Sequence, residues 1–275
     1  MIPLPPAVSP PVSTVPLREA PSIPGEHVRE VATPRGARVR FLLSMPDERP
    51  CGAVLLFPGD TGNMTLELDG RMAWGEKNFL VRSRHLFRAQ SFIVAVVDAP
   101  SDHLTEFGLY GFRSNPDHAA DISAVISALR ALADVPSWLV GTSRGTESVA
   151  CAAACLGPAQ VGGAVLSSTV TRETLEDRNR PGSVYDIALD RIEVPVLLVH
   201  HRDDACAQTP VGDLPALRTR LTAAADVETL VFAGGLAPEG DPCRPFHYHG
   251  FYGIEAPVVS EIGVRIHRRL PAVRA

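Results

Sequence analysis

A serine between two glycines has the clearest chemical potential in this sequence. Ser143 lies in the pattern Gly-Thr-Ser-Arg-Gly, residues 141–145, after the short apolar run 138–140 and before a segment rich in Ala and Cys. Such a pattern holds a serine in a strained turn between a strand and a helix, where larger neighbours would collide. It predicts that Ser143 is a nucleophile. The alternative is that Ser143 only caps the helix that follows it.

A serine hydroxyl becomes a strong nucleophile only when a base accepts its proton and a third group orients that base. Two adjacent carboxylates, Asp203 and Asp204, follow the apolar run 194–201. Two histidines, His247 and His249, follow the last predicted strand. The order Ser, Asp, His along the chain is one in which catalytic triads occur. Either member of each pair is a candidate at this point.

After its first 26 residues, nearly the whole chain resembles the α/β-hydrolase superfamily. In that family the acid often lies four residues after the first histidine of a His-Gly-x-x-Asp segment, and the base often precedes Gly-Phe. Counting from His200, the resemblance implies Asp204 as the acid. It implies His249, which precedes Gly-Phe here, as the base. His201 replaces the glycine of the family pattern, so we expect a reshaped approach to Asp204.

The oxyanion of an acyl-transfer reaction needs backbone N–H donors. One expected donor is the N–H of Arg144, directly after the nucleophile. The resemblance places the second donor in the loop after strand 52–57, where the family often has His-Gly-x and this chain has Pro58-Gly59-Asp60. The N–H of Asp60 is therefore the candidate. Pro58 cannot supply the hydrogen bonds with which a histidine side chain would brace this loop.

Two long loops, residues 60–77 and 100–116, are expected to cover the site. Only 26 residues, 169–194, separate two later strands, which is too short for a lid of several helices, so no large cap domain is expected. Apolar side chains of the two loops are candidates for an acyl or alcohol pocket, with ordinary loop packing as the alternative for each. They are Met64, Leu66, Trp74, Phe107, Leu109, Tyr110 and Phe112.

Together these residues predict a serine hydrolase that cleaves carboxylic esters or thioesters of small molecules through an acyl-enzyme. A peptidase or amidase using the same residues is one alternative. A non-catalytic binding module that keeps the fold is the other, because fold alone does not decide function. The sequence does not indicate the substrate's chain length or an oligomeric state.

The elements that must position these residues alternate along the chain. Residues 27–33 and 37–44 flank a Pro-Arg-Gly turn signal and predict an opening hairpin. Six further apolar runs alternate with amphipathic segments, which is typical of a mainly parallel sheet with helices on both faces. We therefore predict an α/β fold with eight strands, in one catalytic domain over residues 27–275. The amphipathic segments are residues 78–90, 115–133, 209–224 and 257–270.

Residues 1–26 differ in composition from the rest. Eight prolines among the first 24 residues exclude a helix or a central strand, and predict an extended, poorly ordered linker. The segment lacks the basic start and apolar core of a signal peptide. No apolar run in the chain reaches the roughly 20 residues that span a bilayer. The net charge of -5 offers nucleic acid no general attraction.

Five cysteines are present, and two flank the candidate acid and base. Cys206 lies two residues after Asp204, and Cys243 lies six before His249. If Asp204 and His249 hydrogen-bond, their loops meet, and these cysteines could form a disulfide. The bridge would imply a periplasmic or secreted protein. The alternative is two unpaired thiols in a cytoplasmic enzyme. No residue spacing resembles a zinc site, and no metal or other cofactor is expected.

Overall fold

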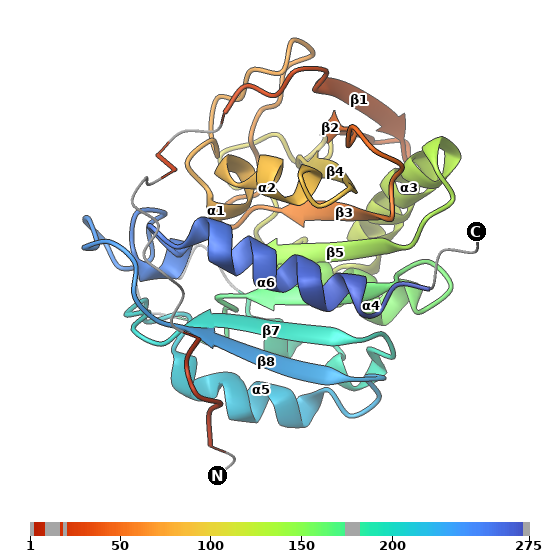
Figure 1. The fold of residues 1–275 in the computed structure, drawn as a ribbon. Helices are drawn as coiled ribbons and strands as arrows, with labels where there is room; N and C mark the ends of the chain where they lie inside the picture. The colour runs from red at the N-terminus through yellow and green to blue at the C-terminus, as the bar shows by residue number, and fades with distance from the viewer. Residues whose placement is uncertain (1–2, 9–16, 19–20, 174–181, 272–275) are drawn as a thin grey trace.

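An eight-stranded sheet forms the centre of the protein (Figure 1). The structure, a computed structural model, describes residues 3–8, 17–18, 21–173 and 182–271. The strands are β1 (His27–Ala32), β2 (Arg38–Ser44), β3 (Gly52–Phe57), β4 (Phe92–Val97), β5 (Ser137–Thr142), β6 (Gly163–Ser167), β7 (Val196–His201) and β8 (Val227–Phe232). Their order in the sheet is β1-β2-β4-β3-β5-β6-β7-β8. The predicted hairpin β1-β2 is antiparallel, as is the pair β2-β4, and the other pairs are parallel. The predicted fold class is confirmed.

Helices cover both faces of the sheet, as Figure 1 shows. The helices are α1 (Phe79–Arg82), α2 (Arg84–Arg88), α3 (Pro116–Leu132), α4 (Gly145–Leu156), α5 (Leu214–Arg220) and α6 (Glu255–His267). Apolar side chains of α3, α4 and α5 pack in one core cluster, and those of α1, α2 and α6 pack in a second. The two clusters lie on opposite faces of the sheet because successive strand residues point to opposite sides.

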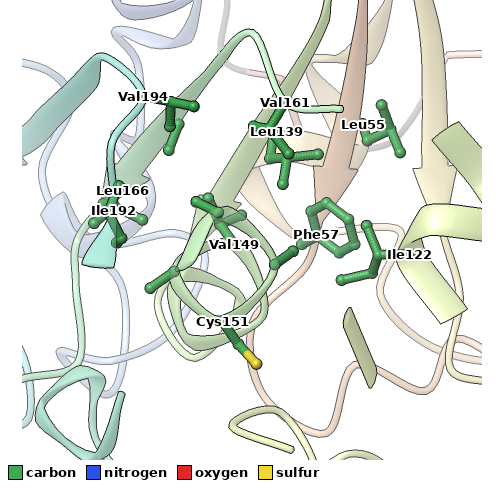
Figure 2. Close-up of a cluster of buried hydrophobic side chains, with 14 of the residues drawn as sticks. Leu55, Phe57, Ile122, Leu139, Val149, Cys151, Val161, Leu166, Ile192 and Val194 are labelled. Carbon is green, nitrogen blue, oxygen red and sulfur yellow. The ribbon is translucent and has the colours of Figure 1, made fainter. Parts of the chain in front are cut away.

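The central strands are apolar on both faces because each face is covered. Leu55 and Phe57 of β3 belong to the cluster under α3 and α4, whereas Val54 and Leu56 belong to the other cluster. In Figure 2, Phe57 lies beside Ile122 of α3, and both belong to the same cluster as Val149 of α4. This alternation explains why β3 reads as a continuous apolar run rather than as an alternating one.

Two of the predicted helical segments are helical in the structure, but with other bounds. The expected helix over 78–90 is two short helices, since Ser83 lies between them and its Oγ donates a hydrogen bond to the carbonyl of Phe79. The helix expected over 209–224 is regular only as α5, over Leu214–Arg220. The predicted cap of α3 is confirmed, because the side chain of Asn115 accepts the N–H of Asp117.

The described part of the proline-rich segment contacts the rest of the protein. The sequence had predicted a linker without such contacts. The N–H of Val8 donates to the carbonyl of Val231 at 2.6 Å, and the N–H of Ala233 donates to the carbonyl of Val8 at 3.1 Å. Val8 thereby adds a parallel bridge at the outer edge of β8. Arg18 forms an ion pair with Glu239.

Candidate active site

Ser143 occupies a strained turn between β5 and α4. Its φ angle is 53°, in the left-handed region that non-glycine residues rarely adopt. A Cβ at Gly145 would lie 2.0 Å from the carbonyl oxygen of Phe57, and one at Gly141 would lie 2.5 Å from that of Gly145. The two glycines of the pattern are therefore required by close backbone contact. The N-cap position of α4 belongs to Arg144, so the alternative role of Ser143 as helix cap is not supported.

A buried acid and an imidazole meet beyond the end of β7. Nδ1 of His249 lies 3.1 Å from Oδ2 of Asp204. The Asp204 side chain is fully buried, and its Oδ1 accepts the N–H of Cys206 at 3.0 Å. Thr209 Oγ1 donates to Oδ2 of Asp204 at 3.0 Å and lies 3.2 Å from Nδ1 of His249. The carboxylate is therefore held in one orientation against the imidazole.

The other candidate of each pair lies elsewhere. Asp203 is exposed and forms an ion pair with its neighbour Arg202. His247 is buried with its ring edge-on to Tyr248, and its Nδ1 has no hydrogen-bond partner among the described residues. The structure therefore brings Asp204 and His249 together.

The electrostatics favour a charged Asp204 beside a neutral His200. Burial alone would raise the pKa of Asp204, but the His249 imidazole and its hydrogen bond outweigh this effect and lower the pKa below its ordinary value. Burial lowers the pKa of His200 to about 4, so this imidazole is neutral at physiological pH. Its Nε2 donates to the carbonyl of Thr209 at 2.8 Å. That contact fixes the loop that carries the threonine.

The loop that carries His249 is anchored by two side chains that sequence reasoning missed. Ser168, directly after β6 and with a φ of 44°, donates from Oγ to the carbonyl of His249 at 2.9 Å. The buried guanidinium of Arg82 donates to the carbonyl of Gly250 at 2.6 Å and pairs with Glu255 at 2.9 Å. The position of Ser168 at a strand end was a usable signal. Nothing local in the sequence marks Arg82.

Ser143 and His249 both line one cavity of about 640 Å³. Of the predicted pocket residues, Met64, Trp74 and Tyr110 line it. Phe107 does not, and its side chain is 56% exposed. Predicting Phe107 in the pocket was therefore wrong. Three other apolar candidates, Leu66, Leu109 and Phe112, are also absent from the lining. Leu66 and Leu109 are buried, and the ring of Phe112 stacks on His103.

Both expected oxyanion donors belong to residues that line this cavity, Asp60 and Arg144. Gly59 packs directly against Ser143, since a Cβ there would lie 2.8 Å from Cβ of Ser143. Asp60 follows with a φ of 53°. The loop after β3 therefore runs beside the serine, as the resemblance implied.

A disulfide joins Cys206 to Cys243, as predicted, with 4.7 Å between their Cα atoms. Cys243 lines the cavity. The other three cysteines, Cys51, Cys151 and Cys155, are not in disulfides. The bridge thus connects the loop of Asp204 to the wall of the cavity.

The described residues contain neither a metal-binding cluster nor a membrane-spanning helix. Their His, Cys, Asp and Glu side chains form no group of three or more that could hold a metal ion. None of their helices has the length and apolar character needed to cross a bilayer.

The sequence matches no protein-family model and no curated protein. Solved structures match it over most of its length. An esterase from Pyrococcus furiosus has a TM-score of 0.60 and 14% identity, with 95% of this chain and 98% of that one covered. Est1E from Butyrivibrio proteoclasticus, with bound ferulic acid, has a TM-score of 0.57 and 14% identity, with 87% and 96% covered. A highly thermostable carboxyl esterase from Bacillus coagulans has a TM-score of 0.57 and 14% identity, with 87% of this chain and 99% of that one covered. With the sheet order, these likenesses show the α/β-hydrolase fold.

Proposed function

We propose that this protein is a serine hydrolase of carboxylic esters or thioesters of small molecules. The observation that carries the proposal is the shared cavity of Ser143 and His249, together with the 3.1 Å contact of His249 with the buried Asp204. The similar solved structures include esterases, which supports an ester rather than an amide as the bond that is cleaved.

In the proposed mechanism, Oγ of Ser143 attacks the carbonyl carbon while Nε2 of His249 accepts its proton. Asp204 accepts a hydrogen bond from Nδ1 of His249 and stabilises the imidazolium that forms. The N–H groups of Asp60 and Arg144 bind the oxyanion of the tetrahedral intermediate. Collapse of this intermediate breaks the ester C–O bond (or the thioester C–S bond), and the alcohol (or thiol) leaves with the proton from His249.

Water completes the reaction. His249 removes a proton from a water molecule, whose oxygen attacks the acyl carbon of the Ser143 ester. The second tetrahedral intermediate collapses to a carboxylic acid, and the proton on His249 returns to Ser143. No redox step is involved, and the residues named are sufficient for both halves of the reaction.

The disulfide beside the site supports a location in an oxidising compartment, periplasmic or secreted. Disulfides persist where thiols are not kept reduced. Cys243 of the bridge lines the cavity, and Cys206 donates its N–H to the Asp204 carboxylate, so the bridge lies beside residues that the mechanism uses.

Labelling and turnover together test the proposal. A fluorophosphonate probe should label the wild type and not Ser143→Ala. The matched control is Ser137→Ala, at the other end of β5, because Ser137 is buried and its Oγ has no hydrogen-bond partner in the described part of the chain. We expect p-nitrophenyl esters of increasing chain length to be hydrolysed. Cleavage of peptide anilides without cleavage of esters would favour the amidase alternative, and labelling of Ser143→Ala would place the nucleophile elsewhere.

A further inference from the structure

Arg113 contacts the loop that carries the proposed Asp60 donor. This arginine lies near the end of the long loop before α3, and it is only 2% exposed. Its Nη2 donates to the carbonyl of Pro58 at 3.1 Å and to the carbonyl of Asp60 at 3.2 Å. A Cβ at Gly62 would lie 2.4 Å from the same nitrogen, so this glycine leaves room for the guanidinium.

These contacts fix the peptide planes around the proposed donor. The carbonyl of Gly59, which shares a peptide with the N–H of Asp60, accepts the N–H of Gly62 at 3.1 Å. Because a trans peptide places N–H and C=O on opposite sides, holding the Gly59 carbonyl fixes the direction of the Asp60 N–H. Arg113 binds the carbonyls of Pro58 and Asp60, which precede and follow that of Gly59. Three consecutive peptides are therefore held in place.

The same guanidinium also binds the helix that begins after Ser143. Nη1 of Arg113 donates to Oγ of Ser148 on α4 at 2.6 Å, and Nε2 of His118 lies 2.9 Å from that oxygen. The second proposed donor, the N–H of Arg144, lies at the start of α4. Arg113 thus contacts both structures that supply oxyanion donors.

The guanidinium is charged at neutral pH. Burial lowers the pKa of Arg113, which the nearby Glu147 carboxylate partly opposes, to about 10. Hydrogen bonds from a charged donor are stronger than those between neutral groups. A buried charge that donates to two backbone carbonyls of one loop can therefore replace the bracing that Pro58 lacks.

We propose that Arg113 is a positioning residue that holds the two oxyanion donors, the N–H groups of Asp60 and Arg144, in a fixed relation to each other. This inference rests on the proposed function. Arg113 acts through the backbone of residues 58–62 and through Ser148, and it does not itself bind the substrate.

Arg113→Met and Arg113→Lys test this role, with Arg84→Met as the matched control. Arg84 is also buried, pairs with Glu26 at 2.6 Å and does not line the cavity. Three measurements are needed. They are kcat and KM for p-nitrophenyl butyrate, the inhibition constant of a trifluoromethyl ketone, which forms a tetrahedral oxyanion adduct with serine, and hydrogen exchange of peptides spanning residues 58–64.

We expect Arg113→Met to lower kcat about 10- to 100-fold and to raise the inhibition constant of the ketone by a similar factor. KM should change less than about threefold. Exchange in residues 58–64 should be faster than in the wild type. The values for Arg113→Lys should lie between those of the wild type and of Arg113→Met, because an ammonium keeps the charge but lacks the planar fork of a guanidinium. Arg84→Met should leave all three measurements near wild type, whatever its effect on stability.

The proposal is overturned if Arg113→Met keeps a kcat within about threefold of Arg84→Met, or if exchange in residues 58–64 does not change. If Arg113→Met does not fold, Arg113→Lys decides by the same criteria. A wild type that neither hydrolyses esters nor reacts with fluorophosphonate would instead refute the proposed function. Hydrogen exchange would then still show whether Arg113 braces the loop.

Discussion

Nδ1 of His249 lies 3.1 Å from Oδ2 of Asp204, and the carboxylate is fully buried. An imidazole that donates from Nδ1 keeps Nε2 as its basic nitrogen. Since His249 lines the same cavity as Ser143, that nitrogen is the group proposed to take the serine proton.

The first prediction separates these residues from their sequence neighbours. His249→Ala and Asp204→Asn should each lower kcat about 10³- to 10⁴-fold, because the base is lost or held in the wrong tautomer. Asp203→Asn and His247→Ala are the matched controls, and both should keep kcat within about threefold of the wild type. The measurement is kcat for a p-nitrophenyl ester, with circular dichroism to check folding. An inactive His247→Ala beside an active His249→Ala would show that the base is His247 and not His249.

The order of strands and helices was predictable because its signals are local. β3 and β4 are continuous apolar runs, since helices cover both faces of the sheet. Asn115 caps α3 from a position that the sequence alone indicated. The disulfide was predictable only indirectly. Once Asp204 is placed beside His249, the loops that carry Cys206 and Cys243 come together.

The contacts that hold the candidate site were not predictable, because they join residues far apart in the chain. Arg113 is 55 residues from Pro58, and Arg82 is 168 residues from Gly250. No period or motif marks an arginine whose partners are backbone carbonyls of a distant loop. The pocket prediction partly failed for a related reason. Phe107 is apolar and lies in the expected loop, but its side chain is exposed and does not line the cavity.

A second prediction concerns stability at acidic pH. Burial lowers the pKa of His118 to about 3, well below its ordinary value. Between this value and an unfolded pKa of about 6.5, the unfolded chain binds a proton that the folded chain does not. The free energy of unfolding therefore decreases as pH falls through this window, by up to about 1.4 kcal/mol per pH unit from this group.

His118→Gln should remove that contribution to the slope between pH 5 and 6.5. Urea unfolding at several pH values measures it, with His27→Gln as the control at an exposed histidine. The variant is expected to lower stability at neutral pH, since Ser148 loses a partner, but the slope is the quantity that tests the prediction. A slope equal to that of the wild type would contradict it.

A third prediction concerns the cavity wall. Trp74 lines the cavity and yet is 70% exposed, so its indole offers apolar surface to a long acyl chain. Trp74→Ala should raise KM for p-nitrophenyl octanoate about three- to tenfold, which corresponds to about 1 kcal/mol of lost apolar contact. KM for the acetate should change little. Phe107→Ala is the control, because that side chain is similarly exposed but outside the cavity. Equal effects of the two substitutions on the octanoate would show that Trp74 does not contact the acyl chain.

The last prediction concerns the disulfide. Thiol titration of the denatured, unreduced protein should find three thiols, those of Cys51, Cys151 and Cys155. Replacing Cys206 and Cys243 together with serine should lower the free energy of unfolding by about 4 kcal/mol on the loop-entropy model, given their separation of 37 residues.

The same double replacement should also lower kcat. The N–H of Cys206 donates to Oδ1 of Asp204 at 3.0 Å, so a loop freed from Cys243 holds the carboxylate less firmly against His249. Cys155→Ser is the control, because Cys155 is exposed and not bridged. Dithiothreitol should reproduce the loss in the wild type and leave the double variant, which has no bridge to reduce, unchanged. Five titratable thiols would refute the bridge itself. Three thiols with an unchanged kcat would show that the bridge stabilises the fold without positioning Asp204.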